Sequence, residues 1–163
     1  MWHRQTIILH WLSAFLIIGT ILAVKNTQGL KLPEKIGAMQ IHAIFGIIIT
    51  SLVFARLYYK IKNRKTNPKS NILANTFHLG IYALLLVIGI SGIGIGIKGG
   101  LFEYLFTDSG SPMRSIFGWI HHNIAGFIIP VIILHVLAVI LHLFKKGDHS
   151  LARIMGKNIK DNS

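Results

Sequence analysis

Four long apolar segments constrain this chain more than any other feature. They cover about residues 7–24, 39–59, 76–97 and 117–144. Roughly 20 helical residues cross the ~30 Å hydrocarbon core of a bilayer, so each segment is long enough to span it. Each must be helical, because the segments are apolar throughout and do not alternate as the strands of a membrane barrel do. The sequence therefore predicts four transmembrane helices.

The links between these segments are short, which makes consecutive helices antiparallel neighbours. We therefore expect one all-α domain over residues 1–163, an integral membrane four-helix bundle with up-down-up-down topology. A cleaved signal peptide is the alternative for the first segment. That segment runs into Lys25, Asn26 and Thr27 without a small-residue cleavage site, so we expect a retained helix.

The charged residues predict how the helices are oriented. Only 13% of the chain is charged and the net charge is +12, whereas about a quarter of a soluble domain is charged. Twelve of the 17 basic residues flank one side of the predicted membrane and five the other. The positive-inside rule then places both termini in the cytoplasm. Because the basic residues lie between and after the apolar segments, we expect contact with membrane lipid and no nucleic acid binding.

The chain contains no cysteine. This excludes disulfides, iron–sulfur clusters, thiolate zinc sites and covalent haem attachment through a Cys-x-x-Cys-His motif.

Histidines are the candidate functional residues. Seven of the nine lie within or at the edges of the apolar segments, where ionisable side chains are costly and point to function: His10, His42, His78, His121, His122, His135 and His142. His121 and His135 are 14 residues apart, which on a continuous helix returns to within about 40° of the same face after a rise of roughly 21 Å. His122 faces nearly the opposite way. The fourth helix thus presents two imidazoles at two depths.

Depth also selects their partners. On antiparallel helices, His10 matches the cytoplasmic depth of His135, and His42 matches the periplasmic depth of His121. Two trans-helix pairs suit two six-coordinate haems b, each iron held by two neutral imidazoles. One alternative is four structural histidines bonded to backbone or hydroxyl groups. Zinc or copper is another, disfavoured because each pair supplies two ligands and nearby carboxylates and thiols are absent.

Other positions keep more than one interpretation. His142 either stabilises the cytoplasmic interface, contacts a haem propionate or lines a quinone site. His78 either lines a quinone pocket or caps the bundle. Arg56 either snorkels toward the basic link or pairs with a propionate, and His122 is a candidate propionate donor on the periplasmic side. The third segment's glycines serve either close helix packing or room for a flat macrocycle.

Several short motifs together resemble those of the bacterial cytochrome b561 family, over almost the whole chain. They are Leu9-His10-Trp11-Leu12, Ile41-His42 with Arg56 fourteen residues later, Phe77-His78-Leu79-Gly80-Ile81-Tyr82, the His121 and His135 pair, His142, and the tail from Gly147 to Met155. The resemblance implies a di-haem, quinone-linked cytochrome of the bacterial inner membrane. It implies haem ligation by the positions matching His10, His42, His121 and His135.

The resemblance also implies electron transfer between a periplasmic one-electron donor and membrane ubiquinone. Some members resemble superoxide oxidases, and a superoxide:ubiquinone oxidoreductase is the enzyme activity we expect if the donor is superoxide. The periplasmic lysines, at positions 25, 31, 35 and 98, would then attract the anion. The alternative is a cytochrome b subunit of a larger respiratory dehydrogenase or hydrogenase complex. A homodimer or a redox partner protein is compatible with either function.

Overall fold

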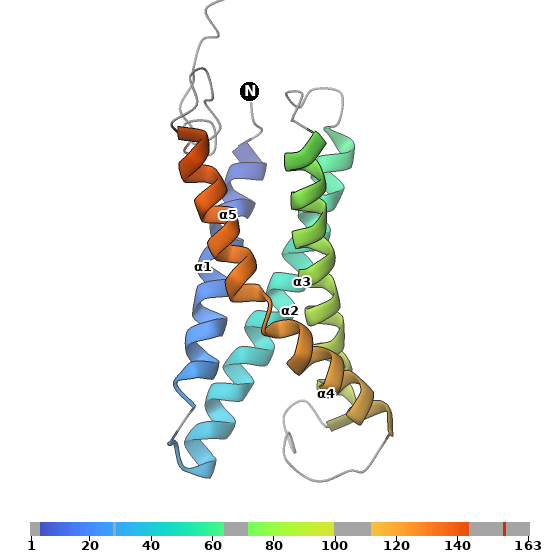
Figure 1. Ribbon diagram of the computed structural model, residues 1–163. Coiled ribbons are helices and arrows are strands. Elements are labelled where there is room, and N and C mark those ends of the chain that lie inside the picture. Colours follow the sequence, from blue (N-terminus) through green and yellow to red (C-terminus); the bar gives the residue numbers. More distant parts are fainter. Residues whose placement is uncertain (1–3, 28, 64–71, 100–111, 144–154, 156–163) are drawn as a thin grey trace, which may run out of the picture.

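The computed structural model describes residues 4–27, 29–63, 72–99, 112–143 and 155. These ranges form α1 (Arg4–Lys25), α2 (Leu32–Lys62), α3 (Ile72–Gly99), α4 (Pro112–Ala125) and α5 (Ile128–Leu143). Figure 1 shows α1 and α3 running one way and α2 and the α4–α5 pair running back. Helices α1, α2 and α3 and the α4–α5 pair give four spans long and apolar enough to cross a membrane. The predicted all-α membrane bundle is confirmed.

Helix α2 begins at Leu32, earlier than the predicted start near residue 39. Lys31 has extended backbone angles, and Pro33 and Glu34 lie in the first turn. Proline is favoured there because the first helical N–H groups have no partner, and a carboxylate is favoured by the helix dipole. The apolar pattern missed this turn because the turn is polar.

The fourth predicted helix, 117–144, is interrupted in the structure. Helix α4 ends at Ala125 and α5 begins at Ile128, with a turn at Gly126 and Phe127. Pro130 explains the break, because proline has no N–H to donate to the carbonyl four residues earlier and its ring clashes with that carbonyl. The prediction of one continuous helix is therefore corrected: His121 lies on α4 and His135 on α5.

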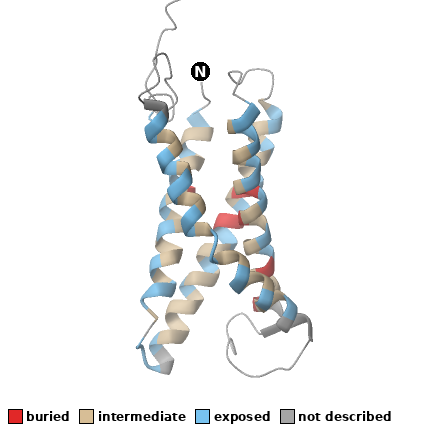
Figure 2. Cartoon of the chain, in the orientation of Figure 1, coloured by how far each residue is buried: buried red, intermediate tan, exposed pale blue. Residues whose placement is uncertain are grey.

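The helices pack along α1–α2, α2–α3 and α3–α4. Within the described ranges, the buried apolar core consists of two α2 and two α3 residues: Ile49, Val53, Tyr82 and Leu85. Most other large apolar side chains lie on the outside, and Figure 2 shows mostly exposed and half-buried positions along every helix. This distribution suits a chain whose surface is solvated by lipid.

Three glycines of α3 allow side chains from α2 and α4 to approach closely. A Cβ at Gly89 would overlap Thr50 Oγ1, one at Gly92 would lie 3.0 Å from His121 Cε1, and one at Gly94 would lie 2.6 Å from Phe117 Cδ2. Protein side chains occupy these positions. The close-packing interpretation of these glycines therefore accounts for them.

Candidate haem-binding site

The first candidate pair joins α1 to α5. The rings of His10 and His135 have their centres 6.2 Å apart, with a tilt of 50° between their planes. Two imidazoles that share one metal through Nε2 have ring centres about 6 Å apart, given a metal–nitrogen bond of roughly 2 Å on each side. The separation of His10 and His135 fits one shared metal ion.

The second pair joins α2 to α4 at the other end of the bundle. The rings of His42 and His121 have centres 6.0 Å apart and are perpendicular. Gly46 lies one turn after His42, and Gly118 lies one turn before His121. A Cβ at either glycine would meet no atom within 4 Å, so both positions leave space for a flat ligand beside the ring pair.

His121 is held in a tautomer that suits metal binding. Its Nδ1–H donates to the carbonyl oxygen of Ile88 at 2.9 Å, and Nδ1 lies 3.3 Å from Ser91 Oγ. The Ser91 hydroxyl is itself directed to the carbonyls of its own helix, Val87 at 2.7 Å and Ile88 at 2.9 Å. A proton fixed on Nδ1 leaves the Nε2 lone pair free, which is the usual arrangement of a ligating histidine.

The Nδ1 of His42 lacks such an anchor. It is buried and has no hydrogen-bond partner among the residues that the structure describes. A buried ring nitrogen without a partner is costly. The two ligand candidates of this pair therefore differ. The Ile88 carbonyl of α3 holds Nδ1 of His121. The His42 ring, in contrast, is held by the backbone of Thr20, and its Nδ1 has no partner among the described residues.

Arg56 points into the bundle and contacts the first pair. Its Nη2 donates to Nδ1 of His10 at 3.2 Å, and its Cζ lies 5.2 Å from the centre of the Tyr82 ring. The Arg56 Nε is buried and has no hydrogen-bond partner in the described part of the chain. Since Nδ1 of His10 accepts this bond, the proton of neutral His10 is on Nε2. Metal binding by His10 through Nε2 therefore requires Arg56 to turn to another acceptor, and a carboxylate such as a haem propionate fits its unused donors.

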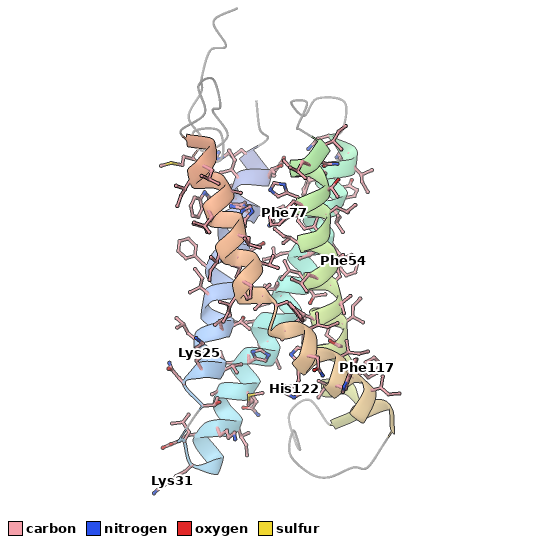
Figure 3. The ribbon with its side chains drawn as sticks, viewed as in Figure 1. Lys25, Lys31, Phe54, Phe77, Phe117 and His122 are labelled. Carbon is pink, nitrogen blue, oxygen red and sulfur yellow. The ribbon has the colours of Figure 1, made fainter. Side chains whose placement is uncertain are left out.

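His78 of α3 adds a third imidazole near this pair. Its Nδ1–H donates to the carbonyl oxygen of Ala74 at 2.6 Å, and its ring centre lies 5.5 Å from that of His135 in a T-shaped arrangement. Phe77 lies parallel to His135, with ring centres 6.3 Å apart. In Figure 3, Phe77 lies in the half of the bundle that carries the N-terminus, and His122 and Phe117 lie in the other half.

Two of the predicted residues, His122 and His142, remain to be placed. His122 is exposed, with its ring centre 6.1 Å from that of His121. His142 belongs to α5, but its side chain is outside the described residues. No cluster of three or more His, Cys, Asp or Glu side chains suited to a metal occurs in the described part of the chain.

Sequence reasoning did not identify the groups that orient the histidines. The carbonyls of Ile88 and Ala74 carry no signal in the sequence, because every residue has one. In the sequence, Ser91 is one hydroxyl residue within an apolar segment. Its position three residues after Ile88 becomes informative only once α3 is known to face His121.

The family comparison agrees with this geometry. The family model of prokaryotic cytochrome b561 matches residues 1–157. The chain belongs to the prokaryotic cytochrome b561 family. It is also similar to cytochrome b561 homolog 2 of Escherichia coli (strain K12), with 24% identity over 185 aligned positions that cover 93% of this chain and 89% of that relative.

Membership of the cytochrome b561 family fixes the general chemistry. Members bind haem b and transfer electrons across the membrane. They are surrounded by lipid and exchange electrons with redox partners. The protein is accordingly a bacterial membrane cytochrome. Each candidate pair would supply two nitrogen donors to one haem iron.

Proposed function

We propose that residues 1–163 form one domain that relays electrons between two haems b. In this proposal, His10 and His135 ligate the haem nearer the cytoplasm, and His42 and His121 ligate the haem nearer the periplasm. The observation that carries it is the ring separation of 6.2 Å in one pair and 6.0 Å in the other. The anchored tautomer of His121 adds support at the second pair.

The haems would supply one-electron redox chemistry, and the protein would hold them rigid. Two imidazoles on each iron would leave no position for an external ligand, which would favour outer-sphere electron transfer over ligand activation. The Ile88 carbonyl keeps the His121 proton on Nδ1 and its Nε2 lone pair available. Arg56, turned away from His10, would hold a propionate through the donors it does not use now. The interruption at Gly126 and Phe127 makes the rise of roughly 21 Å, derived for a continuous helix, only a first approximation to the haem spacing.

We further propose the bacterial inner membrane as the location, with both termini in the cytoplasm. The basic residues concentrate on the side of the termini, which supports this orientation. The donor would be a periplasmic one-electron reductant such as superoxide, and the acceptor would be ubiquinone. Lys25 and Lys31 support an anionic donor, because both are exposed at the end of the bundle opposite the N-terminus (Figure 3).

Haem content tests the ligand assignment. We expect a pyridine haemochrome assay on the purified protein to give two haems b per chain. His121→Ala and His135→Ala should each remove one haem and leave the other. His122→Ala is the matched control, because His122 neighbours His121 but is exposed, and it should keep both. A wild-type ratio of one would contradict half of the proposal.

The donor and acceptor need a separate assay. The protein in liposomes with ubiquinone should be reduced rapidly by superoxide and should turn over only when quinone is present. Slow reduction by superoxide, together with purification in a stable complex with a dehydrogenase, would instead favour the role of an electron-transfer subunit.

A further inference from the structure

The two proposed haem ligands on α4 and α5, His121 and His135, differ in the group that faces their second ring nitrogen. A ligating histidine donates its other N–H to an acceptor, which fixes the ring and makes it a stronger base. His121 has such an acceptor in the Ile88 carbonyl. His135 makes no hydrogen bond to any residue that the structure describes, so its Nδ1–H needs an acceptor when Nε2 binds iron.

His78 is the neighbour equipped to accept. Its own Nδ1–H is committed to the Ala74 carbonyl at 2.6 Å. In neutral imidazole this leaves Nε2 as a bare acceptor. The tautomer of His78 is therefore set by the backbone of α3, one turn before it.

The distance between the two rings also suits this bond. An N–H···N hydrogen bond of about 2.9 Å between two imidazoles puts their ring centres roughly 5 Å apart, since each nitrogen lies about 1 Å from its ring centre. The centres of His78 and His135 are 5.5 Å apart and the planes are at 82°. The two rings are therefore within reach of each other, and rotation of the side chains that points Nε2 of His78 at Nδ1 of His135 would form the bond.

The other neighbours of His135 do not compete for this role. Phe77 offers only a ring face parallel to the imidazole. Arg56, which donates to His10, has no acceptor atom on its side chain. His10 is the proposed partner across the iron, so its Nε2 is already assigned.

We propose that His78 is a positioning residue that accepts a hydrogen bond from Nδ1 of His135. The inference rests on the proposed ligation of one haem by His135. By increasing the basicity of that imidazole, His78 would stabilise ferric iron and lower the midpoint potential of the cytoplasmic-side haem, and it would fix the ring angle.

The test compares His78→Leu, which removes the acceptor, with His78→Gln, which restores one at similar reach. The readouts are haem content, the two midpoint potentials from a spectroelectrochemical titration, and the electron paramagnetic resonance signals of ferric haem. We expect His78→Leu to keep both haems, to shift one midpoint upward and change one low-spin signal, and to leave the other haem unaffected. His78→Gln should return that midpoint toward wild type.

Phe77→Leu is the matched packing control, because Phe77 also contacts His135 but has no acceptor. It should leave both midpoints in place. Unchanged midpoints in His78→Leu, or equal shifts in His78→Leu and Phe77→Leu, would overturn the inference. Loss of a haem in His78→Leu would overturn it too, and would make His78 a ligand. Failure of the proposed function would look different: fewer than two haems in the wild type, or both haems retained in His135→Ala.

Discussion

Arg56 and His10 lie 46 positions apart in the sequence, yet the guanidinium of one donates to the imidazole of the other at 3.2 Å. The contact joins α2 to α1 inside the bundle. It excludes the simple snorkelling interpretation of Arg56, because a side chain that snorkels would extend toward the membrane surface and would not contact His10. It also puts a cation beside the proposed cytoplasmic-side haem.

Replacing that cation should change one haem. We expect Arg56→Gln to lower the midpoint potential of the haem held by His10 and His135, because a nearby positive charge disfavours ferric iron. The direction is opposite to that expected for His78→Leu. A spectroelectrochemical titration measures both, and Lys62→Gln, at the exposed end of the same helix, is the control. Unchanged midpoint potentials in Arg56→Gln would show that the charge of the guanidinium affects neither haem.

Gly92 should be required for the other haem. A Cβ there would lie 3.0 Å from Cε1 and 3.2 Å from Nδ1 of His121, so Gly92→Ala should displace the ring and weaken its bond to Ile88. The haem-to-protein ratio should fall from two toward one. Gly80→Ala is the matched control, since its Cβ would meet nothing within 4 Å. Full haem content in Gly92→Ala would mean that the ring has room to move.

Gly89 should matter for stability rather than for haem ligation. A Cβ at this position would overlap Thr50 Oγ1, and such overpacking typically costs about 1–3 kcal/mol. Gly89→Ala should therefore unfold at lower temperature in detergent. The double variant Gly89→Ala/Thr50→Ala should recover part of the loss, because it removes the overlapping hydroxyl. Additive losses in the double variant would place the cause elsewhere.

If superoxide is the donor, its reaction should depend on salt. An anion attracted by positive charge reacts more slowly as ionic strength rises, because the Debye length falls to about 10 Å at 0.1 M. The rate of haem reduction should fall with added salt, and Lys25→Gln/Lys31→Gln should lower both the rate and its salt dependence. Lys62→Gln, at the opposite end of the bundle, should change neither. A rate independent of salt would rule out steering by these lysines.

Much of the fold could be predicted from the sequence, because a chain can cross a lipid bilayer in only a few backbone structures. The lengths of the apolar segments predict the four spans. The antiparallel order of the helices predicts the depths at which His10 lies near His135 and His42 lies near His121. The break before α5 was missed, although Pro130 was visible, because the apolar pattern continues through it. The inward turn of Arg56 depends on tertiary contacts, and the carbonyls that orient His78 and His121 are backbone groups. Neither feature can be predicted from the types of residue in the sequence.

The turn at Gly126 and Phe127 separates His121, which belongs to one ring pair, from His135, which belongs to the other. A continuous helix would transmit any rotation at His121 to His135, since the two would share one rigid axis. Because α4 and α5 are separate helices, each could change its angle while the other stays in place. The break would therefore allow the environments of the two proposed haems to be altered by substitution one at a time.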